Sequence, residues 1–183
     1  MNQLKEKYRN TISPELAKEF NIKNPMAIPY IEKVTINVSL GEATGNAGVI
    51  DKVLEQITLI SGQKPIATKA KKSISTFKLR QGQAIGVKVT LRGDRMYDFL
   101  DRLFNIVLPR VRDFRGISEK AFDKEANFSL GIKEQILFPE IEYSQIDKVR
   151  GLQVTLTTST KDVQASRKLL EALGMPFEKK ENN

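Results

Sequence analysis

The alternation of apolar and polar residues in "EKVTINVSL", from Glu32 to Leu40, constrains the fold more than any other feature of the sequence. Its apolar positions are Val34, Ile36, Val38 and Leu40, each separated from the next by one polar residue. Alternate side chains of a β-strand point to opposite faces, whereas an α-helix would spread this pattern around its circumference. The segment therefore predicts a strand with one buried and one exposed face.

Four more segments are predicted to be strands. Alternation of the same kind occupies about residues 85–92, 127–132 and 152–158, and a shorter strand is expected at 65–70. Five strands are enough for a sheet with a hydrophobic face.

Apolar residues at helical spacing lie between and beside these strands. Helices are predicted at about residues 4–8, 13–20, 49–61, 96–107 and 161–173. Ser13 is the expected N-cap of the second helix and Pro14 its first position. Gly62, Pro109 and Gly174 are expected to end the last three helices.

The mixture of strands and amphipathic helices predicts the fold class. We expect an α+β fold with a largely antiparallel sheet, helices packed on one face and the other face open. A chain of 183 residues with 40% hydrophobic composition is expected to be a single domain, residues 1–183. A basic loop at about residues 71–84 is expected to project from it.

The face that the helices leave open is predicted to be polar and free of acids. Its residues are Lys33, Thr35, Asn37, Ser39, Lys88, Thr90, Arg92, Asn127, Ser129, Gln153, Thr155 and Thr157. None of these is acidic, although the chain has 22 Asp and Glu residues. A surface that contacts phosphates and ribose hydroxyls must exclude carboxylates and offer hydrogen-bond donors. The alternative is that threonine is simply favoured at exposed strand positions.

A long acid-free stretch strengthens the case for a polyanionic partner. No Asp or Glu occurs between Glu55 and Asp94, and the eight cations in this interval equal the net charge of +8. Within it, "KAKKSISTFKLRQGQAIG" from Lys69 to Gly86 is predicted to connect two strands. Its Phe77 is either a core residue under the loop or an aromatic surface for stacking on a base or ribose.

Two further segments differ in charge. Arg110, Arg112 and Arg115 follow a predicted helix end, where they either bind phosphate or favour the helix C-terminus. From Glu119 to Asp147 seven acids stand against three lysines. This acidic stretch suits a basic protein partner, and a merely solvated face is the alternative.

Several classes of function are disfavoured by what the sequence lacks. Without His and Cys the commonest general base, thiol nucleophiles and zinc sites are missing. The loop "GEATGNAG" between a strand and a helix matches neither common phosphate-binding motif, and Glu140 with Glu142 is too common a pair to indicate Mg²⁺. No cofactor, metal or catalytic residue is therefore expected. No apolar run is long enough for a membrane span, and "MNQLKEKYRN" has no apolar signal core, so we expect a cytoplasmic protein.

Six sequence blocks resemble one known family. They are "ISGQKP", "KKSISTFKLRQGQAIG", "KVTLRG", "LPRVRDFRG", "SLGIKEQILFPEI" and "VRGLQVTLTT", in this order along nearly the whole chain. The chain resembles bacterial large-subunit ribosomal protein number five, which binds 5S ribosomal RNA. The resemblance implies a non-enzymatic structural constituent of the ribosome that attaches 5S rRNA to the large subunit in the central protuberance.

The resemblance also implies where the partners bind. The 5S rRNA contact involves Lys33, Asn37, Gln63, Phe77 and Thr90, and we add Thr35, Lys88 and Arg92 because they share the predicted open face. The basic loop would contact the peptidyl-site tRNA through Lys72, Ser73, Thr76, Lys78, Arg80 and Gln81. The acidic stretch would bridge to a small-subunit head protein through Glu134, Glu140 and Glu142. Large-subunit rRNA and other 5S rRNA-binding proteins are further implied partners.

The sequence departs from the common family pattern at Gln83-Ala84, where a proline before Ile85-Gly86 is frequent. Ala84 is expected to leave the return limb of the basic loop less restrained. The tail "EKKENN", residues 178–183, extends past the usual end, and no role is assigned to it. Two other functions remain alternatives at this point: a nucleotide-using or RNA-modifying enzyme built on "GEATGNAG", and a sequence-tolerant DNA-binding protein.

Overall fold

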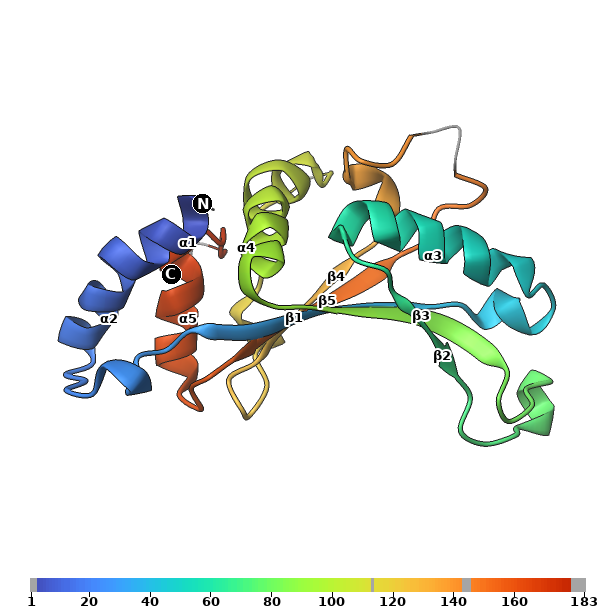
Figure 1. Ribbon diagram of the computed structural model, residues 1–183, viewed down its shortest axis with the longest axis horizontal. Coiled ribbons are helices and arrows are strands. Elements are labelled where there is room, and N and C mark those ends of the chain that lie inside the picture. Colours follow the sequence, from blue (N-terminus) through green and yellow to red (C-terminus); the bar gives the residue numbers. More distant parts are fainter. Residues whose placement is uncertain (1–2, 113, 143–145, 179–183) are drawn as a thin grey trace. The chain divides into compact units, whose positions relative to one another are not determined.

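The computed structural model describes residues 3–112, 114–142 and 146–178 (Figure 1). These residues form two compact units. Unit 1 lies within Met1–Val34, Arg92–Leu130 and Thr155–Asn183, and unit 2 comprises Thr35–Leu91 and Gly131–Val154. The expectation of one domain stays a prediction. Residues 179–183 of the tail lie outside the described residues.

Within the described residues the strands form one five-stranded sheet of order β2-β3-β1-β5-β4. Their bounds are β1 Ile31–Ser39, β2 Ile66–Lys69, β3 Ala84–Leu91, β4 Phe128–Ile132 and β5 Leu152–Thr158. The predicted strands and the α+β fold with an antiparallel sheet are confirmed. Strands β1, β4 and β5 each contribute residues to both units.

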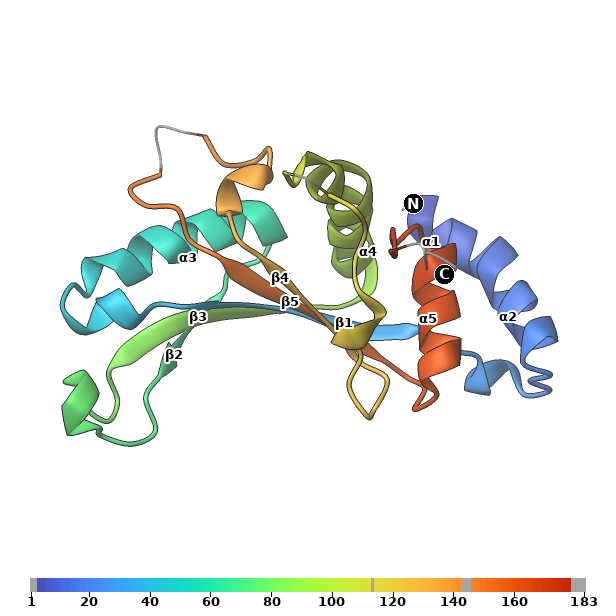
Figure 2. The same ribbon diagram turned by 180° about the vertical axis from the view of Figure 1, so that it is seen from behind.

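Unit 2 pairs its part of the sheet with helix α3, Gly48–Ser61 (Figures 1 and 2). The helix covers one face through Val53, Ile57 and Ile60, which are almost fully buried together with the inward-pointing side chains of β1 and β3. Gly62 ends the helix as predicted, with φ of 65° and its N–H bonded to the Thr58 carbonyl at 2.9 Å. The opposite face of this part of the sheet has no covering helix in either view.

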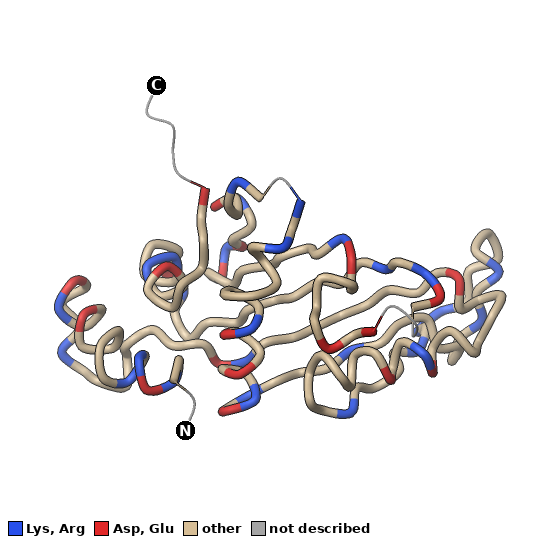
Figure 3. Tube along the Cα trace, turned by 90° about the horizontal axis from the view of Figure 1, so that it is seen from above, with Lys and Arg blue, Asp and Glu red and all other residues tan. Residues whose placement is uncertain are grey.

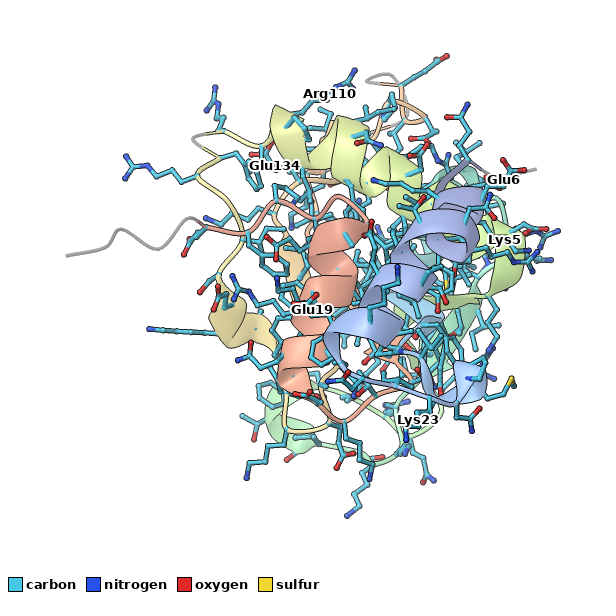
Figure 4. The ribbon with its side chains drawn as sticks, turned by 90° about the vertical axis from the view of Figure 1, so that its left-hand side faces the viewer. Lys5, Glu6, Glu19, Lys23, Arg110 and Glu134 are labelled. Carbon is cyan, nitrogen blue, oxygen red and sulfur yellow. The ribbon has the colours of Figure 1, made fainter. Side chains whose placement is uncertain are left out.

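Unit 1 contains the remaining longer helices. They are α1 Gln3–Lys7, α2 Ser13–Glu19, α4 Gly93–Arg102 and α5 Val163–Ala172, with π-helical turns at Tyr8–Ile12 and Leu103–Val107. The α2 and α5 helices lie side by side, and Glu19 forms an ion pair with Lys168 at 3.2 Å (Figure 4). The core of unit 1 includes Phe99, Leu103 and Leu169, all fully buried. Asp162 caps α5 by accepting a hydrogen bond from the Gln164 N–H at 2.9 Å.

Short 3-10 turns connect these elements. They are Pro25–Ala27, Gly41–Thr44, Ser75–Phe77, Leu108–Arg110, Glu119–Ala121 and Gln135–Leu137.

Two predicted helix boundaries are wrong. Ser13 is not an N-cap, because it has helical dihedral angles and its N–H bonds back to the Tyr8 carbonyl, so the helical chain continues from α1 into α2. Pro14 has no N–H to donate, and the π-helical turn directly before it accommodates the missing bond. Pro109 does not end helical structure, because it lies at the start of the 3-10 turn Leu108–Arg110, where a missing N–H costs little.

Candidate RNA-binding face and its flanking loops

In unit 2 the outward side chains of β1 and β3 form a polar surface, which we call the polar face. Thr35, Asn37 and Thr90 are half-buried, whereas Ser39 and Lys88 are exposed. They alternate with buried valine, isoleucine and leucine side chains that point toward the α3 side. In the described part of the chain, the side chains of Asn37, Lys88 and Thr90 form no hydrogen bond or ion pair, although the Thr90 carbonyl accepts one from Gln63. Their donors are therefore available to a ligand.

Strand β2 adds two residues that sequence reasoning missed. The antiparallel register pairs Ile66 with Lys88 and Thr68 with Gly86, and directly opposed residues point to the same face. Ile66 is 66% exposed there, an apolar surface beside a lysine. A strand of four residues is too short for its alternation to be recognised, but antiparallel pairing across the basic loop could have placed it.

Gln63 lies at the edge of the polar face, where backbone bonds fix it. Its Nε2 donates to the Thr90 carbonyl at 3.2 Å, and its own carbonyl accepts from the Ser61 hydroxyl at 2.8 Å. The structure thus brings the predicted residues Gln63 and Thr90 together. Gln63 and Thr90 are 27 residues apart, and no pattern in the sequence indicated their contact.

Gly86 allows a close approach of three strands. A Cβ atom at this position would lie 2.8 Å from the Thr68 hydroxyl and 2.8 Å from the Val38 carbonyl oxygen. Real Cβ contacts are longer, so only glycine fits between β2 and β1 here.

In unit 1 some predicted face residues have side-chain partners, whereas others have none among the described residues. Lys33 is half-buried on β1, and Arg92 is exposed directly before α4. The Ser129 and Thr155 hydroxyls bond each other at 3.2 Å. Asn127 donates to Asp123 at 3.0 Å and accepts from the Thr158 N–H at 3.3 Å, so its amide has a structural role. The sequence could not separate these two kinds of polar residue.

The basic loop is a hydrogen-bonded hairpin that extends beyond β2 and β3, on the side of the sheet away from α3 (Figure 1). Ile74 and Leu79 exchange backbone bonds of 2.9 and 3.1 Å, and Ala70 closes the base through the Gln83 carbonyl at 2.8 Å. Lysine and arginine positions of this loop are coloured blue in Figure 3. The predicted loop residues Lys72, Ser73, Thr76, Lys78, Arg80 and Gln81 are all exposed.

Phe77 lies at the tip of this hairpin in the 3-10 turn Ser75–Phe77. Its side chain is 68% exposed, so it is not a core residue under the loop. Of the two interpretations left open by the sequence, the structure favours the one in which the ring is available for stacking.

Gln83 replaces the restraint that a proline would supply. Its Oε1 accepts from the Arg80 N–H at 3.3 Å, and its Nε2 donates to the Thr44 carbonyl at 3.2 Å. One side chain therefore joins the return limb of the loop to the turn Gly41–Thr44. The expectation of a less restrained limb at Ala84 did not foresee this bridge.

The acidic stretch is divided between the units. In unit 1 its acids have internal partners: Glu119 pairs with Arg167 at 2.8 Å, and Glu125 with Lys161 at 3.3 Å. In unit 2 Glu134 and Glu142 are exposed and Glu140 is half-buried (Glu134 is labelled in Figure 4). We call residues 134–142 the acidic segment. The acidic segment stays the predicted site of protein binding.

An ionic cluster, which we call the Arg150 cluster, joins Asp147, Lys148 and Arg150 to the turn Gly41–Thr44. Arg150 donates to Glu42 at 2.7 Å through Nε and to both Asp147 oxygens at 2.6 and 3.0 Å, while Lys148 contacts Glu42 at 2.8 Å. Hydrogen bonds from Arg150 lower the pKa of Asp147 to about 2. Those from Lys148 and Arg150 hold the pKa of Glu42 below its ordinary value. Sequence reasoning missed this cluster.

The turn Gly41–Thr44 has the geometry of a structural turn. Its only acid, Glu42, is engaged by two cations, and α3 begins four residues after the turn, at Gly48.

The exposed Arg110, Arg112 and Arg115 form no ion pair within the described ranges. No group of acidic side chains in the described part of the chain could hold a metal ion. Among the same residues, no helix combines the length and apolar character that crossing a membrane requires.

Comparisons with known proteins agree along almost the whole chain. A family model described as ribosomal protein L5 matches residues 24–80, and a second model, for the C-terminal part of the same ribosomal protein family, matches residues 84–177. A large ribosomal subunit protein uL5 from Desulforamulus reducens is 55% identical over 179 residues, which is 98% of this chain and 99% of the relative. Those of Brevibacillus brevis and Lactobacillus johnsonii are each 56% identical over 97% of this chain and 98% and 99% of their own.

Proposed function

Because the chain belongs to the ribosomal protein L5 family, we propose that its polar face binds 5S rRNA and attaches it to the large ribosomal subunit. Membership itself defines the broader role: the chain is a structural protein of the large subunit in the cytoplasmic ribosome, and it is not an enzyme. Ribosomal RNA is accordingly its partner.

The observation that supports RNA binding most strongly is the composition of the polar face. Thr35, Asn37 and Thr90 offer neutral hydrogen-bonding groups, and Lys88 offers a cation without an internal carboxylate partner among the described residues. An RNA helix presents phosphates and 2′-hydroxyls across a wide, shallow minor groove, which suits a broad surface of donors. Lys33 and Arg92 of unit 1 belong to the same predicted set.

The basic loop and the acidic segment are the proposed contacts for tRNA and for a small-subunit protein. The basic loop exposes Lys72, Lys78 and Arg80 with no acid among its residues, so it suits the backbone of the peptidyl-site tRNA. Contacts to phosphates do not depend on base identity, as a site for every tRNA requires. The acidic segment would meet a basic small-subunit head protein and form an intersubunit bridge. In the central protuberance the chain would also neighbour large-subunit rRNA and other 5S rRNA-binding proteins.

The first test is retention of 5S rRNA by the purified protein in direct competition with duplex DNA of equal length. We expect 5S rRNA to displace the duplex, because shape and 2′-hydroxyl contacts add to the charge interaction only with RNA. Equal competition would show that the polar face responds to charge alone. It would refute specific 5S rRNA binding and leave membership of the large subunit intact.

A further inference from the structure

The start of the acidic segment is bonded to Lys148 and Arg150 inside unit 2. Gln135 is 3% exposed, and its N–H donates to the Arg150 carbonyl at 3.0 Å. Its side chain donates to the Lys148 carbonyl at 2.7 Å and accepts from the Arg150 N–H. The start of the segment is therefore fixed by three hydrogen bonds to residues just before β5. A buried amide whose groups are all paired holds one geometry.

Arg150 also binds a carboxylate from elsewhere in the chain. Its side chain is 8% exposed, and a buried guanidinium is tolerated only when counter-charges surround it. Asp147 lies three residues away and supplies two acceptors. Glu42 supplies a second carboxylate from 108 residues away, beside the Lys148 carbonyl that Arg150 also contacts at 3.3 Å, and the second oxygen of Glu42 contacts Lys148. Glu42 is thus the partner that ties the segment to the body of unit 2.

We propose that Glu42 is the positioning residue of the acidic segment. By holding Arg150 and Lys148 it fixes the two residues to which Gln135 is bonded, and with them the surface that Glu134, Glu140 and Glu142 present to a basic protein. The motif "GEATGNAG" thereby has a function unrelated to phosphate binding. The identity of the partner rests on the proposed function, whereas the positioning is a property of the free protein.

The same turn holds the basic loop through a different atom. Gln83 bonds to the backbone carbonyl of Thr44, which a substitution at Glu42 leaves in place. The two connections are therefore separable: the Glu42 side chain serves the acidic segment, and the Thr44 carbonyl serves the loop. This separation provides an internal control.

The positioning is tested in the free protein by residue-resolved hydrogen exchange of Glu42→Gln, which removes the charge and keeps the shape. We expect exchange of the Gln135, Phe138 and Ile141 amides to accelerate about tenfold or more, because their bonds open when the segment is released. Exchange of the Ala70 and Gly82 amides, which close the base of the loop, should stay within about twofold of the parent.

Two further variants separate positioning from general loss of stability. Glu55→Gln removes an exposed carboxylate from α3 outside the Arg150 cluster and should leave exchange unchanged. Glu42→Asp keeps the charge and should restore part of the protection of the segment. Uniform acceleration across unit 2, or unchanged exchange of the segment in Glu42→Gln, would overturn the proposal.

A second readout uses large subunits reconstituted with each variant. Association with small subunits, measured by sedimentation, should weaken several-fold for Glu42→Gln, while binding of 5S rRNA stays within about twofold of the parent. The triple variant Glu134→Gln, Glu140→Gln, Glu142→Gln tests the bridge itself. If that variant associates like the parent, the bridge is wrong, and the exchange experiment still decides whether Glu42 positions the segment.

Discussion

Replacing Gly86 by alanine tests the close approach of β2, β3 and β1. In a strand without steric restriction this change stabilises a protein, because glycine loses more backbone entropy on folding, by about 0.5–1 kcal/mol. Here the added methyl group would lie 2.8 Å from both the Thr68 hydroxyl and the Val38 carbonyl oxygen. The hydroxyl can rotate away, but the carbonyl belongs to β1 and can move only with that strand. The sign of the effect should therefore reverse.

The expected cost is that of overpacking, about 1–3 kcal/mol, which for a chain of this length lowers Tm by roughly 2–12 °C. Denaturant unfolding followed by circular dichroism measures the free energy of unfolding. Adding Thr68→Ala should recover only part of the loss, since the Val38 contact remains. Gly131→Ala is the matched control, because a Cβ there meets nothing within 4 Å.

The result also bears on function, because Thr68 and Gly86 point to the polar face. Displacing β2 should weaken 5S rRNA binding in Gly86→Ala and leave it unchanged in Gly131→Ala. If Gly86→Ala is as stable as Gly131→Ala, or Thr68→Ala restores it fully, the three-strand packing argument fails.

Four further predictions concern charge and hydrogen bonding. Lys88→Ala should reduce the salt dependence of 5S rRNA binding by about one unit of slope in a plot of log K against log salt, and an unchanged slope would remove Lys88 from the contact. Asn37→Ala should cost about 1–3 kcal/mol of binding free energy with the slope unchanged, and parental affinity in a folded variant would refute the polar face as the RNA site. The double variant Lys78→Ala, Arg80→Ala should retain 5S rRNA but weaken peptidyl-site tRNA binding equally for all tRNAs in filter-binding assays; discrimination among tRNAs would contradict it. Because the folded pKa of Asp147, about 2, lies below its ordinary 3.8, the ion pair stabilises the protein above about pH 4 and is lost as the pH falls toward 2. Acid unfolding of Asp147→Asn should show a smaller dependence on pH over that interval.

The secondary structure could be predicted because its signals are local. Alternation from Val34 to Leu40 and the glycine at position 62 each depend on residues a few positions apart, and the structure confirms them. The boundary at Ser13 failed for a related reason. The local sequence around Ser13 is compatible both with a helix N-cap and with a position inside a continuous helix. Only the packing of the preceding turn decides between the two.

The candidate site could be predicted only in part, because polar contacts over long sequence separations leave no periodic signal. The Glu42–Arg150 pair spans 108 residues, and the Gln63–Thr90 bond spans 27. Each depends on which strands become neighbours, and strand order cannot be read from alternation. The exposure of Phe77 likewise depended on the hairpin geometry of the loop rather than on its composition.

The division of three strands between the two units determines the order in which the units can be completed during synthesis. All the residues of unit 2 have been made once Val154 is added, whereas unit 1 still lacks the end of β5 and the whole of α5. Synthesis proceeds from the N-terminus, so every residue of the part with the polar face and the basic loop has been made before the final helix of the other part. Neither unit is a continuous piece of sequence, so neither can be expressed alone by simple truncation.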